Sequence, residues 1–195
     1  MIEATCGTTR TGIGGWGSRL CALAAVLVLA AGCASIAVED YSNEKPAFDL
    51  KEFFTGKLVA KGAFYGLTGS LDRRFTASIV GTWEGDKGKL EEEFIWSDGE
   101  KQYRTWVLEK VGDNKFRGTA GDVVGEATGR GAGNAFNWNY KLRVKTGEEE
   151  GDSIDVRMDD WIHLIDQNTV LNRTDMTWYG LSVGEVVLTI EKVGS

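Results

Sequence analysis

A polar cluster in the last quarter of the chain carries side chains that are capable of acid–base or binding chemistry. Asp159, Asp160 and His163 lie close together around Trp161. On a strand, Asp159, Trp161 and His163 share one face, and Asp160 lies on the other. One carboxylate therefore points to each side of the strand, and a buried one needs a cationic partner. The candidate partners are Arg73, Arg74, Arg157 and Arg173.

This cluster has two interpretations. It either binds the polar headgroup of a ligand or forms a structural ion pair. The ion pair is favoured because such pairs are also common inside folds. For the headgroup interpretation, Asp159 and Arg173 are the candidates, since the guanidinium fork of arginine matches a carboxylate or phosphate. A single histidine with scattered carboxylates does not predict a metal site.

Gly180–Gly184 reads Gly-Leu-Ser-Val-Gly, which matches the pattern around the nucleophile of serine hydrolases. That arrangement needs a strand before the serine and a helix after it. Here Glu185–Glu191 has the pattern of a strand, and His163 precedes the serine, against the hydrolase order. The segment therefore predicts a turn, and we expect no catalytic residue, no enzymatic activity and no cofactor.

The chain begins with the layout of an export signal. Arg10 and Arg19 precede an apolar run, Leu20–Cys33, which is too short for a stable membrane span and ends in small residues. An uncleaved membrane anchor is the alternative. Leu29–Cys33 reads Leu-Ala-Ala-Gly-Cys and resembles the bacterial lipobox. The resemblance implies cleavage before Cys33, a diacylglyceryl thioether on its sulfur and an acylated amino terminus.

Lipidation would place the domain on a membrane of the cell envelope, facing the periplasm. Ala34 follows the cysteine where aspartate would resemble the inner-membrane retention signal, so the outer membrane is the expected destination. The expected organisation is a signal peptide over 1–32, a lipidated cysteine and flexible tether over 33–47, and one domain over 48–195.

Composition excludes several classes of function. The chain has a net charge of −7, so it is a poor candidate for binding nucleic acid. Cys6 and Cys21 would leave with the leader and Cys33 would carry lipid, so no thiol would remain for a disulfide, a metal site or a nucleophile. The domain must then be stable through its core alone.

The pattern of apolar residues predicts one short helix followed by strands. Over 48–56, Asp49 is placed to cap a helix, Glu52 stands three residues later, and Phe48 and Phe53 are placed as a hydrophobic staple. From Lys57 onward apolar residues alternate with polar ones. Strands are expected at 58–65, around 73–83, 89–96, 102–110, 115–120, 123–129, 136–145, 153–165, 170–178 and 184–192.

Short turns between successive strands indicate an up-and-down meander. A sheet of so many strands would leave two edge strands with unpaired backbone groups unless it closes on itself. We therefore expect an all-β, closed or nearly closed antiparallel up-and-down barrel of about ten strands, with the helix across one end. A two-sheet sandwich is the competing architecture. The Glu91–Glu93 run is expected to be solvated strand surface.

A series of motifs runs through the chain in a recognisable order: Pro46–Leu58, Arg74-Phe75, Gly81–Trp83, Gly121–Ala127, Asp159–Trp161, Asn172-Arg173 and Val183–Val186. In this order they resemble an uncharacterised family of bacterial lipoproteins, catalogued as "domain of unknown function 3833". The resemblance covers nearly all of the chain after the leader. It implies a lipoprotein, is compatible with a lipocalin-like barrel, and implies no activity or catalytic residue.

Two functions remain in competition. The first is binding of an apolar or amphiphilic small molecule in a cavity lined by Trp83, Trp138, Tyr140 and Trp161, with Asp159 and Arg173 at its polar end. The second is a non-catalytic envelope protein with a filled core, whose surface docks a protein partner. A lumen above roughly 300 Å³ would favour the ligand.

Overall fold

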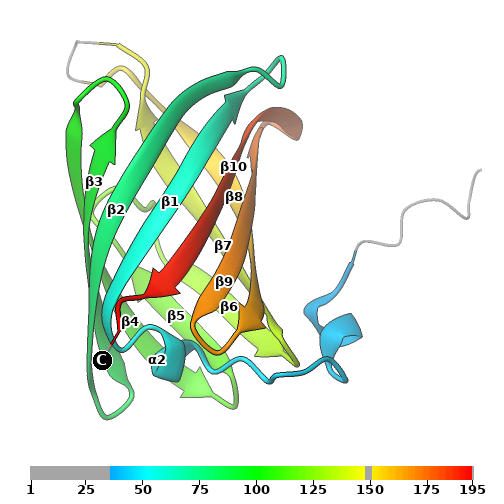
Figure 1. Cartoon of the computed structure of the whole chain (residues 1–195). Helices are drawn as coiled ribbons and strands as arrows, with labels where there is room; N and C mark the ends of the chain where they lie inside the picture. The colour runs from blue at the N-terminus through cyan, green and yellow to red at the C-terminus, as the bar shows by residue number, and fades with distance from the viewer. Residues whose placement is uncertain (1–35, 148–150, 195) are drawn as a thin grey trace, which may run out of the picture. The chain divides into compact units, whose positions relative to one another are not determined.

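A computed structural model of the chain describes residues 36–147 and 151–194. Ten antiparallel strands each pair with the next in sequence, and the last pairs with the first, so the sheet is a closed barrel (Figure 1). The predicted all-β meander is confirmed, and closure excludes the two-sheet sandwich. The strands are β1 (Gly56–Gly66), β2 (Leu71–Glu84), β3 (Lys87–Trp96), β4 (Lys101–Gly112), β5 (Lys115–Thr119), β6 (Ala127–Ala132), β7 (Ala135–Lys145), β8 (Ser153–Asp166), β9 (Thr169–Trp178) and β10 (Leu181–Lys192).

The seam between β1 and β10 closes the barrel along most of the length of both strands. The pairing runs from Leu58 opposite Lys192 to Gly66 opposite Gly184 without a shift in register. Alternate residues of each strand therefore point into the barrel, as on β2, where Phe75, Ala77 and Ile79 are buried and their neighbours in sequence are more exposed.

The short helix α2 (Leu50–Phe53) lies across the end of the barrel at which β1 begins and β10 ends (Figure 1). Its predicted cap is present, because Asp49 Oδ1 accepts a hydrogen bond of 2.9 Å from the backbone nitrogen of Glu52. The rings of Phe48 and Phe53 are 5.6 Å apart, as the staple predicted. Phe54 is buried beside them, and its carbonyl accepts a hydrogen bond of 3.0 Å from Trp83 Nε1. This end of the barrel is closed by apolar packing.

Replacing Asp49 with alanine removes the only side-chain cap of α2, so we expect the free energy of unfolding to fall by about 1 kcal/mol. Equilibrium unfolding in urea measures this loss. Asp49→Asn is the control: it keeps a capping oxygen and should retain most of the stability. A full loss in the asparagine variant would show that the charge, rather than the cap, matters.

The polar stretch before the helix differs from the expected tether. Residues 38–41 form a 3-10 helix, η1 (Val38–Tyr41), and Val38 is buried. The ring of Tyr41 lies 5.1 Å from the ring of His163 and 5.9 Å from that of Trp161, on the outside of β8. The compact unit therefore begins at Ala37 rather than at Phe48.

One predicted strand is displaced along the chain. Residues 123–129 were expected to form it, but β6 begins only at Ala127, and the residues before it form a loop. β5 and β6 are the two shortest strands, and the loop between them pairs with the far part of β7. Val124 N donates to Lys141 O at 2.9 Å, and Arg143 N donates to Asp122 O at 2.8 Å. The loop thereby completes the barrel wall and fixes Asp122.

The leader, the lipobox and Cys33 lie outside the described residues. Within residues 36–147 and 151–194, no helix has the length and apolar character needed to cross a membrane.

Candidate functional site

The barrel encloses a cavity of about 660 Å³. Leu50 and Phe54 line it at the α2 end, and most of its wall is apolar. Its aromatic lining comes from five of the strands and consists of Phe64, Phe75, Phe94, Trp96, Trp106, Phe136, Trp138 and Tyr140. Met158, Met176 and Leu188 complete the apolar surface on the opposite side. The interior of the sheet is therefore not filled by its own side chains.

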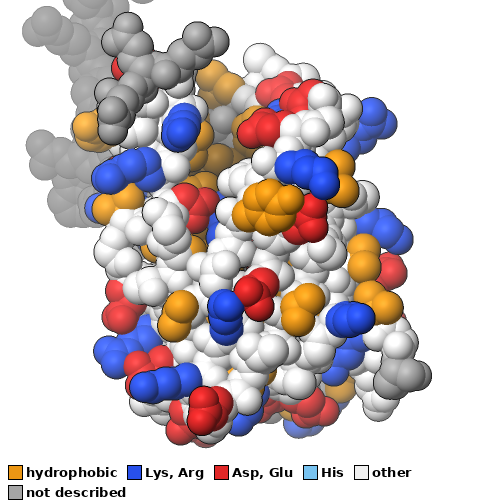
Figure 2. All heavy atoms as spheres, turned by 90° about the vertical axis from the view of Figure 1, so that its left-hand side faces the viewer, with side chains coloured by type: hydrophobic (Ala, Val, Ile, Leu, Met, Phe, Trp, Pro, Cys, Tyr) orange, Lys and Arg blue, Asp and Glu red, His pale blue; other side chains and the backbone are white. Residues whose placement is uncertain are grey.

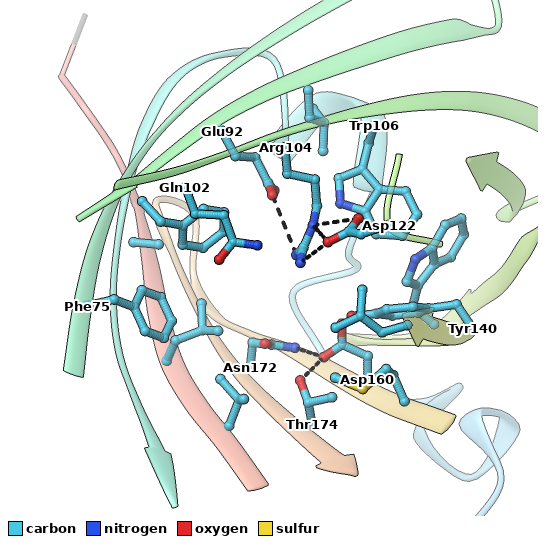
Figure 3. A pocket seen from close by; sticks show the side chains of 18 of the residues that line it. Phe75, Glu92, Gln102, Arg104, Trp106, Asp122, Tyr140, Asp160, Asn172 and Thr174 are labelled. Atoms are coloured by element: carbon cyan, nitrogen blue, oxygen red, sulfur yellow. Dashed lines mark hydrogen bonds and ion pairs between the residues drawn. The ribbon is translucent and has the colours of Figure 1, made fainter. Parts of the chain in front are cut away.

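A charged group interrupts this apolar wall on β3 and β4. Glu92 and Arg104 stand opposite each other in the β3–β4 ladder, so both point inward at the same level. Arg104 Nε donates to both carboxylate oxygens of Asp122, at 3.1 and 2.9 Å, and Nη2 donates at 2.7 Å. Arg104 Nη1 is 4.0 Å from Glu92 Oε2, which is too far for a hydrogen bond. Arg104 is thus held by Asp122 from the β5–β6 loop (Figure 3).

A second polar group lies across the cavity on β8 and β9 (Figure 3). Asp160 Oδ1 accepts hydrogen bonds from Asn172 Nδ2 at 2.6 Å and from the Thr174 hydroxyl. Asn172 and Thr174 are only 4 % and 3 % exposed. Both are neighbours of Asp160 across the ladder, since Thr174 is its direct partner and Asn172 stands two residues away. These neutral donors allow a carboxylate to be buried without a direct cationic partner.

Burial dominates the acidity of these carboxyl groups. It raises the pKa of Glu92 to about 7, because the lowering effect of Arg104 is smaller and Asp122 and Asp160 add like charge. Burial also raises the pKa of Asp160, against the hydrogen bonds from Thr174 and Asn172, which stabilise its charged form. The pKa of the Tyr140 hydroxyl is raised by burial and by the nearby carboxylates, so this group stays protonated. The site thus holds a carboxyl group, Glu92, that titrates near neutral pH.

The open end of the barrel carries a different arrangement. Arg73 stacks on the ring of Trp96, with its Cζ 4.2 Å from the ring centroid. It also forms salt bridges of 2.7 Å with Asp98 and with Glu100. Trp96 Nε1 donates to Gln102 Oε1 at 3.3 Å. Arg73, Asp98 and Glu100 are therefore engaged with one another at the mouth, above the level of Glu92 and Arg104.

Two of the predicted ligand-binding residues line the cavity. Trp138 is buried on β7, and Tyr140 follows two residues later on the same face. The Trp106 ring packs against both, with centroid distances of 5.8 and 5.3 Å. Glycines make room for Trp138, since a Cβ on Gly129 would lie 2.0 Å from its ring.

The other four predicted residues do not line the cavity, and their expected positions are corrected here. Trp83 belongs to the closed end, where it holds α2. Asp159, Trp161 and Arg173 lie on the outside of the barrel. Asp159 accepts a hydrogen bond of 2.7 Å from Asn137, and Arg173 forms salt bridges with Asp175 and Glu185.

The physical reason for this error is that both faces of β8 carry apolar residues. Trp161 stacks on His163, and Tyr41 of η1 covers both rings from outside. The outward face therefore appears apolar in the sequence, although Met158, Asp160 and Ile162 form the inward one. Of the two neighbouring aspartates, Asp160 rather than Asp159 has its carboxyl group in the cavity.

The sequence analysis missed Glu92, Arg104, Asp122, Asn172 and Thr174 as site residues. Glu92 was expected to be solvated within its acidic run, but its side chain is only 11 % exposed. A signal was present in the sequence. Leu90, Glu92 and Phe94 are alternate residues of one strand, so Glu92 shares a face with two apolar residues that are expected to point inward. Asp122 carries no such signal, since it lies on a loop.

The Gly180–Gly184 motif forms the predicted turn only at its start. Gly180 has a φ of 80°, but Leu181–Gly184 already belong to β10, so a strand rather than a helix contains and follows the serine. Among the residues that the structure describes, no group of three or more histidine, cysteine, aspartate or glutamate side chains is arranged to hold a metal ion.

Comparison with solved structures supports the barrel fold. The S-type phycobiliprotein lyase CpeS from Guillardia theta has a TM-score of 0.54 and 12 % sequence identity, over 76 % of this chain and 94 % of that one. Its barrel, like this one, is lipocalin-like. A protein of unknown function from the DUF3598 family of Nostoc punctiforme has a TM-score of 0.46 and 14 % identity, over 82 % of this chain and 53 % of that one. At these identities the likeness concerns the fold.

No curated protein matched the chain. A family model described as "Protein of unknown function (DUF3833)" matches residues 27–192, which include the whole barrel. The motif resemblance from the sequence is thereby confirmed, and the chain belongs to the DUF3833 family.

Proposed function

We propose that this protein is a non-catalytic carrier that binds an amphiphilic small molecule inside its barrel, and that lipid on Cys33 anchors it in the cell envelope. The observation that carries the binding proposal is the cavity of about 660 Å³. Ligand pockets typically have volumes of about 300–1,000 Å³. A barrel built only to display its surface would fill this space with side chains, as small barrels do.

The lining specifies the character of the ligand. Aromatic and aliphatic side chains make up most of the wall, and they favour an apolar body through burial of its surface. Apart from the polar residues toward the mouth, such as Arg73 and Gln102, the polar side chains form two groups that face each other, around Arg104 and around Asp160 (Figure 3). A few convergent polar groups in an apolar pocket are typical of a site that orients one end of a ligand. The likeness to the lyase concerns the fold alone and supplies no ligand.

The outer face of β2, β3 and β4 gives little support to the docking alternative. On the face shown in Figure 2, single hydrophobic side chains are separated by acidic and basic ones. Val80, Ile95 and Val107 are exposed on β2, β3 and β4, with charged residues among their neighbours. Protein interfaces more often present a contiguous apolar patch.

The binding proposal predicts that a small molecule copurifies with the protein. Native mass spectrometry of the full chain, with Cys33→Ser to prevent lipidation, should show an added mass that organic extraction removes. Val186 lines the cavity, whereas Val187 follows it on β10 and is absent from the lining. Val186→Trp should therefore abolish the added mass, and the matched variant Val187→Trp should retain it. A folded wild-type protein without a bound molecule, or equal behaviour of the two variants, would count against a cavity ligand.

The anchoring proposal rests on the leader, Leu29–Cys33 and Ala34, and it places the protein on the periplasmic side of the outer membrane. Radiolabelled palmitate should enter the wild-type protein and not Cys33→Ser. Persistence of the full-length leader in wild-type cells would contradict the proposal.

A further inference from the structure

The charged groups in the cavity are distributed unevenly between its mouth and its interior. At the mouth, Arg73 is paired with Asp98 and Glu100, and Arg143 is paired with Asp155. Lys145, at the end of β7, adds an exposed positive charge there. Among the described residues, the interior by contrast contains three carboxyl groups and one guanidinium: Glu92, Asp122, Asp160 and Arg104. Below the mouth, acidic groups therefore outnumber cationic ones.

The single interior cation is already engaged. Arg104 directs Nε and Nη2 to Asp122 in a bidentate arrangement, which is the strongest geometry that this pair can adopt. Its remaining nitrogen, Nη1, lies on the Glu92 side. An anionic headgroup would have to approach this nitrogen between carboxylates on both walls, and like charges at such distances repel.

Two carboxyl groups of the interior have oxygens that accept no hydrogen bond from the described residues, whereas Arg73 Nε, a buried donor without a partner, lines the mouth. Glu92 Oε2 is buried and has no hydrogen-bond partner, and its other oxygen receives no hydrogen bond from the described residues either. On the opposite wall, Asp160 accepts only through Oδ1, which leaves Oδ2 without a donor in the described part of the chain. A buried carboxylate oxygen without a donor is costly, so a ligand that donates hydrogen bonds here would remove an existing penalty.

We infer that the bound ligand is a cationic amphiphile, of the class of protonated amines, whose headgroup donates hydrogen bonds to Glu92 and Asp160 from the centre of the cavity. This inference rests on the proposed function and specifies its ligand. The apolar body packs against the aromatic walls, and the ring faces of Trp106 and Tyr140 add favourable contacts for a cation. Figure 3 shows Glu92 and Asp160 on opposite sides of the open space.

The test compares three probes with the same tail and different headgroups. Dodecylamine, dodecanol and dodecanoate are titrated at pH 8 into the full chain with Cys33→Ser, and binding is followed by the fluorescence of the cavity tryptophans. Dodecylamine should bind about tenfold or more tightly than dodecanol, since charge-assisted hydrogen bonds contribute more than neutral ones. Dodecanoate should bind most weakly. Val186→Trp, with the cavity filled, measures binding at the acidic outer surface.

A pair of adjacent variants assigns the preference to the site. Glu92→Gln removes the buried charge, whereas Glu91→Gln makes the same change on an exposed neighbour. The preference for dodecylamine over dodecanol should disappear in Glu92→Gln and remain in Glu91→Gln. Asp160→Asn gives a second measurement from the opposite wall if the Glu92→Gln barrel does not fold.

The outcomes separate the two proposals. If none of the probes binds, the proposed function fails, and the inference fails with it. If dodecanol or dodecanoate binds as tightly as dodecylamine, the cavity binds a ligand but the headgroup inference is wrong. Equal effects of Glu91→Gln and Glu92→Gln would also overturn it, because the preference would then come from the overall charge of the protein.

Discussion

Arg104→Met lowers the free energy of unfolding by about 3 kcal/mol, near the lower end of the range for breaking a buried ion pair. The expected loss arises because Arg104 is the single interior cation, and its removal leaves Asp122 and Glu92 without compensation. Methionine fills a similar volume, so the loss reports charge rather than a cavity. The partial exposure of Asp122, 27 % for its side chain, places the expected value at the lower end.

Urea unfolding followed by tryptophan fluorescence measures this effect, and Arg117→Met is the matched control. Arg117 on β5 bonds Glu109 with a similar distance, 2.7 Å, but both side chains are largely exposed. Exposed pairs of this kind contribute about 0–1 kcal/mol. Equal losses in the two variants would show that the Arg104 cluster is no more important for stability than a surface salt bridge.

The second large effect is a decrease in stability as pH rises from about 4.5 to 7. An unfolded chain ionises Glu92 near its ordinary pKa of 4.5, whereas burial in the fold raises that pKa to about 7. Between these values the folded protein binds more protons than the unfolded one, so deprotonation destabilises the fold. The loss amounts to about 3 kcal/mol when complete.

A difference measurement isolates the contribution of Glu92. The free energies of unfolding of wild type and Glu92→Gln are compared from pH 4.5 to 8. The stability of the variant relative to that of the wild type should increase by about 3 kcal/mol across this range. Burial lowers the pKa of His163, which favours folding as pH rises, but this contribution is the same in both proteins and cancels. A constant difference over the whole range would show that folding leaves the pKa of Glu92 at its ordinary value.

The sequence predicts the barrel well because the barrel depends on local features. Two-residue alternation defines the strands, and short turns leave each strand beside the next. Asp49 and Glu52 mark the helix in the same local way. The strand prediction fails at 123–126, where the path of the chain depends on pairing with β7 rather than on any local pattern.

The candidate site is less predictable, since it depends on which face of each strand points inward. Trp161 looks like a lining residue until η1 is known to cover it from outside. Glu92 looks solvated until Arg104 is known to stand opposite it on β4. Both facts are contacts between segments that are distant in sequence, so composition and spacing alone do not reveal them.

The continuous ladder of strands also determines how a bound molecule exchanges. Strand pairing runs all the way around the wall, and α2 covers one end, so release follows the barrel axis past Arg73 and Trp96. The residence time of a ligand is then controlled at this exit, and differences in affinity between ligands should appear mainly in their dissociation rates.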